Sequence, residues 1–214
     1  MFRYVNKLLE EGVAQVLVID DGNGAEYLAL FQQLAELEGC TVLTHPENRG
    51  KGAGLKTGFR YFSNHLSDLS GIVTADADDQ HLIKDVLNVG DHLANRKAGV
   101  VLGTRNFGGE NIPARSLIGN RFTSLLIKVL FGLYIPNTQT GLRGIVTEEL
   151  PWLMELAGDH FDYEMKMLIR LIKQKKDIII VEIETVYEEE HISSYDTYAD
   201  TVRIAKHILG EIFR

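Results

Sequence analysis

The stretch IVTADADDQH, residues 72–81, joins a short apolar segment to a cluster of acidic side chains. Residues 72–75 are small or apolar and predict a buried strand, and Asp76 and Asp78 follow it at positions i and i+2. Carboxylates this close repel one another unless a cation lies among them. Asp76, Asp78 and Gln80 offer only oxygen ligands, which suit Mg²⁺ or Mn²⁺ and not zinc. We therefore expect a divalent metal here, of the kind that carries the phosphates of a nucleotide.

Strands and helices alternate on both sides of this stretch. The predicted strands are residues 16–19, 41–44, 72–75, 99–103 and 178–183, and the predicted helices are residues 4–9, 26–37, 52–65, 83–94, 116–131, 161–172 and 197–212. This alternation predicts an α/β fold with a mostly parallel sheet and helices on both faces. Ligands of such sheets bind beyond the carboxyl ends of the strands. Asp20, Asp21, Asp76 and Asp78 all follow strands, so we expect them to converge on one cleft.

Composition limits the class of protein. A chain of 214 residues with 45% hydrophobic content can bury a full core as one domain. A net charge of -8 argues against a general nucleic-acid binder. Cys40 is the only cysteine, which excludes an intrachain disulfide and a cysteine-based zinc site. No apolar run reaches the roughly 18 residues of a membrane span. We expect a cytoplasmic protein, soluble or peripheral at the inner face of the membrane.

The second half of the chain differs in charge. Residues 111–147 contain no Asp or Glu but carry Arg115, Arg121, Lys128 and Arg143. Within them, the predicted helix 116–131 has apolar side chains over more than a narrow stripe. A basic helix with a broad apolar face can lie at a membrane surface. A buried helix of the core is an equally good interpretation, and both can hold for different faces of the helix.

Five short motifs occur in a fixed order. They are VIDDG at 18–22, ENRGKG at 47–52, DADDQH at 76–81, LGTR at 102–105 and TQTGLR at 138–143. Together they resemble the family 2 glycosyltransferases, of the branch that includes dolichyl-phosphate mannose synthase and its bacterial polyprenyl-phosphate relatives. The resemblance runs from about residue 6 to the C-terminus. It implies a single domain of the glycosyltransferase A fold, with a nucleotide-sugar-binding half at 1–110 and an acceptor-binding half at 111–214.

The resemblance also implies roles for individual residues. The matched positions are Asp20, Asp21, Asn48, Gly50, Lys51 and Asp76 for the nucleotide; Asp76, Asp78 and Gln80 for Mg²⁺ or Mn²⁺; Asp78, Arg105 and Arg143 for catalysis; and Arg115, Arg121 and Arg143 for the acceptor phosphate. Tyr163 and Glu164 match a Tyr-Glu pair of the family, for which we expect structural support. The Asp20-Asp21 pair has a simpler alternative, because aspartates often close the turn after a strand.

The implied reaction is an inverting transfer of a hexose from a UDP- or GDP-sugar to a polyprenyl phosphate at the cytoplasmic membrane face. A metal held by Asp78 would stabilise the charge that develops on the leaving nucleoside diphosphate. A phosphate monoester has a second pKa of about 6, so such an acceptor needs no general base, whereas a sugar hydroxyl does. The acid-free, arginine-bearing stretch at 111–147 fits an anionic lipid head group better than a neutral sugar.

One departure from the family concerns the first strand. Relatives begin with a mid-sheet strand that contacts the base, whereas this chain opens on a helical pattern and shows no strand before Val16. We therefore expect a vacant position in the centre of the sheet. This leaves an alternative open, a non-catalytic or truncated module of the same fold that lacks donor binding and takes a strand from a membrane-protein partner or a second copy. A sugar nucleotidyltransferase is a weaker alternative, because its glycine-rich basic signature is not visible near the N-terminus.

Overall fold

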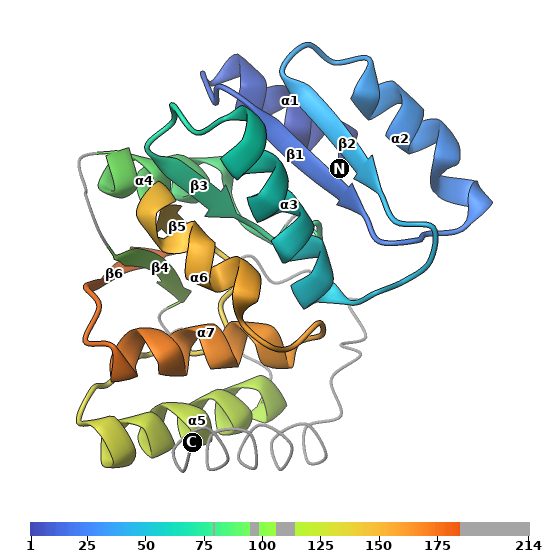
Figure 1. The fold of residues 1–214 in the computed structure, drawn as a ribbon. Helices are drawn as coiled ribbons and strands as arrows, with labels where there is room; N and C mark the ends of the chain where they lie inside the picture. The colour runs from blue at the N-terminus through green and yellow to red at the C-terminus, as the bar shows by residue number, and fades with distance from the viewer. Residues whose placement is uncertain (79, 95–98, 106–113, 185–214) are drawn as a thin grey trace.

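The computed structural model describes residues 1–78, 80–94, 99–105 and 114–184, with the side chains of 114–119 outside the description. Figure 1 shows the order and arrangement of the elements. The helices are α1 (Phe2–Glu10), α2 (Leu28–Ala35), α3 (Lys51–His65), α4 (Ile83–Ala94), α5 (Ala114–Phe131), α6 (Leu150–Glu155) and α7 (Asp162–Lys173), with 3-10 turns at Ala25–Tyr27 and Thr147–Glu149. The strands are β1 (Val16–Asp20), β2 (Cys40–Thr44), β3 (Gly71–Thr74), β4 (Val100–Arg105), β5 (Arg143–Val146) and β6 (Ile178–Ile183). The predicted helix 197–212 lies outside the described residues.

The sheet layer is divided into two parts. β1 and β2 form a parallel pair, and β3, β5, β4 and β6 form a four-stranded sheet in that order. β4 and β6 are parallel, whereas β5 runs antiparallel to β3 and β4. Among the described residues no strand pairs with the second edge of β1 or of β3. Within the part of the chain that the structure describes, the mid-sheet position between these two edges therefore holds no strand, as expected.

Helices on both faces join the two parts. α3 contacts both β1 and β3, in front of the sheet as Figure 1 is drawn, and α1 lies behind. From α1, Val5 packs into a cluster with Leu34 of α2 and Cys40 of β2, while Leu8 packs into a second cluster with Val101 of β4. The helices thus bridge the gap between the two parts of the sheet.

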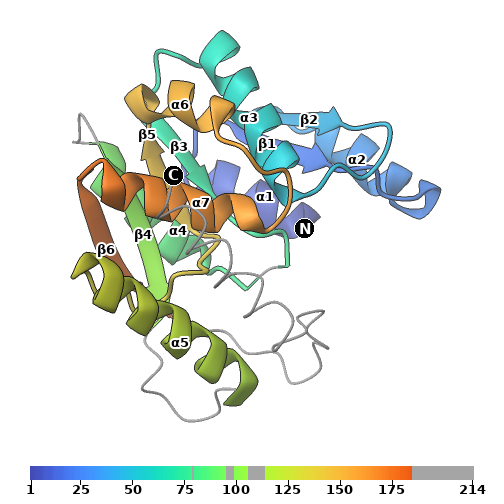
Figure 2. The same cartoon turned by 60° about the horizontal axis from the view of Figure 1, so that its bottom comes forward.

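The main core lies between the four-stranded sheet and helices α3, α6 and α7. Phe59, Leu102, Leu153 and Tyr163 are all buried in it. Helices α6, α7 and α5 are stacked in that order in both ribbon views (Figures 1 and 2). All residues of β5 are buried, whereas β3 is only partly buried and β1 is buried only at its last residue. The difference is expected for strands that each lack a neighbour on one side.

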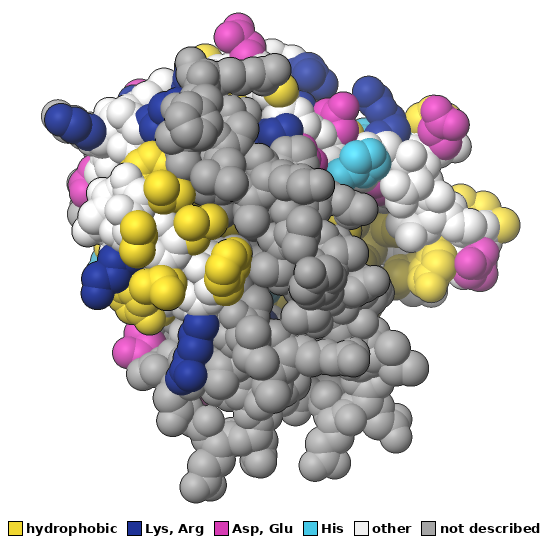
Figure 3. Space-filling model, turned by 90° about the horizontal axis from the view of Figure 1, so that it is seen from below, with side chains coloured by type: hydrophobic (Ala, Val, Ile, Leu, Met, Phe, Trp, Pro, Cys, Tyr) yellow, Lys and Arg dark blue, Asp and Glu magenta, His cyan; other side chains and the backbone are white. Residues whose placement is uncertain are grey.

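Helix α5 has one buried side and one exposed side. Thr123, Ser124 and Ile127 face the interior, while Leu125 and Val129 are 58% and 74% exposed. Figure 3 shows hydrophobic side chains gathered on this lower face of the molecule. The core interpretation therefore applies to one face of the helix, while the opposite face is exposed and its contact with a membrane stays a prediction. None of the described helices is long and apolar enough to cross a membrane.

Candidate functional site

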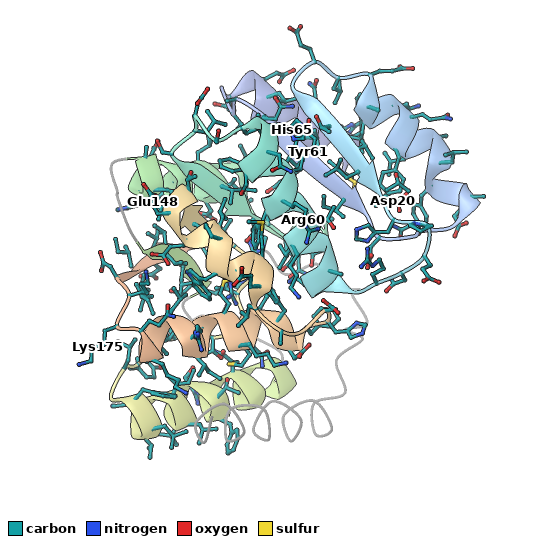
Figure 4. All side chains as sticks on the ribbon, in the orientation of Figure 1. Asp20, Arg60, Tyr61, His65, Glu148 and Lys175 are labelled. Atoms are coloured by element: carbon teal, nitrogen blue, oxygen red, sulfur yellow. The ribbon has the colours of Figure 1, made fainter. Side chains whose placement is uncertain are left out.

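The loops that follow β1, β2 and β3 meet at the amino end of α3. Gly22, just after β1, has a φ of 73°, and a Cβ at this position would overlap the backbone of Glu47 in the loop that leads to α3. Positive φ and close backbone approach both favour glycine. Figure 4 shows Asp20 at this end of β1. The first two motifs are therefore packed against each other at one edge of the sheet.

The two aspartates after β1 are bound to the protein itself. Asp20 Oδ1 accepts hydrogen bonds from the backbone N of Asn23 at 2.9 Å and from its side-chain amide at 2.8 Å. Asp20 therefore closes the turn after the strand, which is the simpler of the two interpretations given for the Asp20-Asp21 pair. Asp21 accepts from the backbone N of Arg49 at 3.0 Å and of Gly50 at 2.8 Å. Asp21 therefore holds the loop in front of α3, and Asn48 lies exposed in that loop.

A hydrogen-bonded histidine accounts for the charge state of Asp21. Burial would raise the pKa of Asp21, but the contact with His45 and the backbone N–H groups of Arg49 and Gly50 lower it overall. His45 is buried and was not assigned a role from the sequence. No sequence motif marks it, because its contact with Asp21 depends on how β1 and β2 pair.

Lys51 and Asp76, expected to serve the donor, are bound to each other. Lys51 begins α3, and its Nζ lies 2.6 Å from Asp76 Oδ1 and 2.7 Å from Glu164 Oε2. Burial would lower the pKa of Lys51, but the carboxylates of Glu164 and Asp76 raise it overall. Burial would likewise raise the pKa of Asp76, yet His81 and Lys51 hold it far below its usual value. Both groups are therefore charged at neutral pH.

Asp76 is enclosed on its other side as well. His81 Nε2 lies 3.6 Å from Asp76 Oδ2, which is too long for a good hydrogen bond. Both ring nitrogens of His81 are buried without a hydrogen-bond partner among the described residues. A Cβ at Gly141 would overlap the Asp76 carboxylate. The motifs at 76–81 and 138–143 therefore pack directly on each other around this side chain.

The expected metal ligands fit a divalent ion only in part. Asp78 is exposed, and its Oδ1 accepts a 3.2 Å hydrogen bond from the backbone N of Gln80. The side-chain oxygen of Gln80 accepts from Arg105 at 3.2 Å, and one oxygen of Asp76 is held by Lys51. Within the described part of the chain, no group of three His, Cys, Asp or Glu side chains could hold a metal. Asp78 is thus the most accessible of the three expected ligands.

Arg143 is internal rather than facing a ligand. It is 1% exposed, its Nε donates to the Thr140 carbonyl at 2.8 Å, and its NH1 donates to the Glu164 carbonyl at 2.9 Å. No surface is open to a donor or acceptor phosphate, so the expected catalytic and phosphate roles of Arg143 do not agree with its position. Its contacts instead join β5 to α7. Arg121 is exposed on α5, and the side chain of Arg115 lies outside the described residues.

Comparisons with known proteins agree with this arrangement of motifs. Residues 3–148 match the family model of glycosyl transferase family 2. The chain is 28% identical over 193 residues to the uncharacterized protein MJ1222 of Methanocaldococcus jannaschii, with 88% of this chain and 77% of that protein covered. It is 27% identical over 202 residues to the UDP-N-acetylglucosamine–dolichyl-phosphate N-acetylglucosaminyltransferase of Methanococcus voltae, with 86% of this chain and 80% of that protein covered.

Solved structures show the same fold. Glucosyl-3-phosphoglycerate synthase from Mycobacterium tuberculosis, in complex with phosphoglyceric acid, has a TM-score of 0.65 at 16% identity and covers 92% of this chain and 69% of its own. Another mycobacterial protein has a TM-score of 0.63 at 16% identity, and the match covers 97% of this chain and 68% of that protein. At this level of identity the likeness concerns the fold alone.

Proposed function

Because this chain belongs to glycosyl transferase family 2, we propose that it transfers a hexose from a UDP- or GDP-sugar to a polyprenyl phosphate. We propose inversion at the anomeric carbon, Mg²⁺ or Mn²⁺ as cofactor, and the cytoplasmic membrane face as the location. The Methanococcus voltae relative is named for a transfer of this class, from a UDP-sugar to dolichyl phosphate. The observation that carries the proposal is the contact between Lys51 and Asp76, which joins two family motifs at the carboxyl edge of the sheet.

The residues at this edge can bind and polarise a nucleoside diphosphate. Lys51 and Arg105 place two positive charges beside residues 76–80. Such charges stabilise the diphosphate as the glycosidic bond breaks and negative charge develops on it. A divalent ion, when bound, adds Lewis-acid stabilisation, and Asp78 would be its main ligand with Gln80 nearby. We assign donor binding to residues 1–110 and acceptor binding to residues 111–214.

The second half offers a surface for a lipid acceptor. Arg121 and Lys128 are exposed on α5 together with Phe122, Leu125 and Val129. Basic and exposed apolar side chains on one helix favour the surface of an anionic membrane. An acceptor phosphate that reaches the site from this surface is already largely ionised at neutral pH, and so requires no general base.

The proposal is tested by mixing the protein with Mn²⁺, a panel of UDP- and GDP-sugars, and undecaprenyl phosphate in detergent. The expected product is a glycosyl phospholipid, identified by mass spectrometry, whose anomeric configuration is opposite to that of the donor. Transfer to sugar hydroxyls but never to the lipid phosphate would refute the acceptor class. A product with retained configuration would refute inversion.

The divided sheet favours one other candidate, a module of this family that lacks donor binding. Titration with UDP or GDP in the presence of Mn²⁺ separates the two, because a ligand that binds the folded state raises the melting temperature in proportion to the logarithm of its concentration. A transferase gives such a shift with one of the two nucleotides. A non-binding module gives none.

A further inference from the structure

Glu164 occupies a position between two cations at the start of α7. It is 6% exposed, and its Oε2 lies 2.7 Å from Lys51 Nζ. Its Oε1 lies 3.8 Å from Arg143 Nε, and its backbone carbonyl accepts from Arg143 NH1. Glu164 is therefore held on one side by Arg143, which is buried and hydrogen-bonded to two backbone carbonyls. Lys51, by contrast, is 24% exposed and lies at the edge of the site.

We infer that Glu164 is a positioning residue for the donor: it holds the Lys51 ammonium against Asp76, with one N–H directed to the phosphates of the nucleotide. The identity of that ligand rests on the proposed function. An ammonium has three N–H donors. Asp76 and Glu164 each take one, at 2.6 and 2.7 Å. One donor remains, and the Lys51 side chain is 24% exposed.

A clamp of this kind has a physical reason. A lysine has four rotatable bonds, and its ammonium is a point charge with no fixed direction, so a free lysine loses much rotamer entropy when it binds a phosphate. An ion pair with one partly exposed carboxylate restrains it little. A second, buried carboxylate fixes the ammonium before the ligand arrives. Glu164 thereby links α7, in the proposed acceptor half, to the donor half of the molecule.

The alternative is that Glu164 serves only the stability of the fold, through Arg143. The test therefore compares Glu164→Gln with Glu149→Gln. Glu149 is also buried and also pairs with a lysine, Lys176 at 3.0 Å, but lies away from residues 76–80. Two further variants, Lys51→Met and the double variant Lys51→Met/Glu164→Gln, complete a cycle that isolates the coupling between the two side chains.

The first measurement does not depend on function. The wild type, Glu164→Gln and Glu149→Gln are labelled briefly with acetic anhydride, and the acetylation of Lys51 is followed by mass spectrometry against that of the exposed Lys175. We expect Lys51 to be labelled about tenfold faster or more in Glu164→Gln than in the wild type or in Glu149→Gln, since a charged hydrogen bond to its ammonium is lost. Equal labelling in all three proteins would overturn the inference.

The second measurement is the affinity for whichever of UDP or GDP binds the wild type with Mn²⁺, by calorimetry. Glu164→Gln should weaken binding by about tenfold or more, and Glu149→Gln should not. In the Lys51→Met background the Glu164 substitution should have no further effect. Additive losses, or no loss in Glu164→Gln, would overturn the inference. A wild type that binds neither nucleotide would refute the proposed function, and the labelling result would then decide by itself whether Glu164 holds Lys51.

Discussion

Asp21 Oδ1 and His45 Nδ1 lie 2.6 Å apart at the point where β1 and β2 end. The other ring nitrogen of His45 lies 2.9 Å from the Thr57 hydroxyl on α3. Together with the backbone hydrogen bonds to Arg49 and Gly50, this chain of contacts connects both strand ends to the helix that begins with Lys51. Asp21 therefore acts from within the protein, by holding the loop that leads to α3.

Replacement of Asp21 by Asn should lower the stability of the fold. Asn keeps the shape of the side chain, but only its amide oxygen can accept hydrogen bonds, whereas both carboxylate oxygens of Asp21 accept them. We expect a loss of about 1–3 kcal/mol in the free energy of unfolding, measured by urea denaturation at neutral pH. Asp68→Asn, at an exposed position, is the control and should change it little. Equal effects of the two substitutions would contradict the structural role.

The effect of Asp21→Asn should also depend on pH. The pKa of Asp21 is below its ordinary value of 3.8 in the folded state. A carboxyl with a depressed folded pKa contributes stability above the unfolded pKa, and this contribution is lost as the pH falls through the folded value. The stability difference between wild type and Asp21→Asn should therefore narrow below about pH 3.8. A difference that persists in stronger acid would mean that charge is not its cause.

Arg143→Lys tests whether Arg143 is internal or binds a phosphate. Lysine keeps the charge, but it lacks the planar guanidinium that donates hydrogen bonds to the carbonyls of both Thr140 and Glu164. We expect a loss of roughly 1.5–3 kcal/mol in the free energy of unfolding, because hydrogen bonds from a buried charged group are lost. Arg60→Lys, at an exposed site on α3 (Figure 4), should have almost no effect. Full stability of Arg143→Lys with lost transfer would restore the phosphate role.

Asp78→Ala should abolish metal-dependent transfer without unfolding the protein. Asp78 is exposed, and its one described hydrogen bond is local, to Gln80. We expect kcat to fall by about a hundredfold or more, the usual cost of removing one electrostatic stabiliser, with the melting temperature unchanged. Steady-state assays over a range of Mn²⁺ concentrations measure it. Asp91→Ala, also exposed and on α4, is the control. An Asp78→Ala variant with full activity would remove Asp78 from the site.

Leu125→Glu should weaken binding to vesicles that contain anionic phospholipid. Leu125 and Leu28 are both 58% exposed, the first on α5 and the second on α2. If α5 lies at the membrane, burial of one leucine is worth about 1.5–3 kcal/mol, so its loss should weaken partitioning about tenfold or more. Leu28→Glu should not change it. Co-sedimentation with the vesicles gives the comparison, and equal effects of the two substitutions would refute the assignment of this face.

The alternating apolar segments were sufficient to predict most of the fold. The predicted strand 178–183 coincides with β6, and the predicted helix 83–94 coincides with α4. The strand β5 was not predicted, because its four residues include Arg143 and Gly144 and its neighbours β3 and β4 are distant in sequence. The short helix α6 was missed as well, since Pro151 and Trp152 conceal its periodicity.

The sequence predicted that the strand ends come together, but not how the side chains there pair with one another. The ends of β1 and β3 come together with the start of α3, as parallel strands require. The sequence could not show that Lys51 would pair with Asp76 and Glu164, because that depends on how α7 packs on α3. The enclosure of Arg143 was not predicted for the same reason: its partner Glu164 lies beyond the acid-free stretch that suggested a phosphate.

The edges of β1 and β3 that have no strand partner among the described residues give a prediction for hydrogen exchange. The backbone N of Val16 donates to Gly39, on the β2 side, and the amides of a strand point alternately to its two sides. The amides of Leu17 and Ile19 therefore point away from β2, toward the vacant position. We expect them to exchange much faster than the amide of Val18, which faces β2, and faster than that of Leu102, in a strand with two neighbours. Residue-resolved exchange by NMR measures this directly. Equally slow exchange at Leu17, Val18 and Ile19 would mean that the edge of β1 has a strand partner in solution.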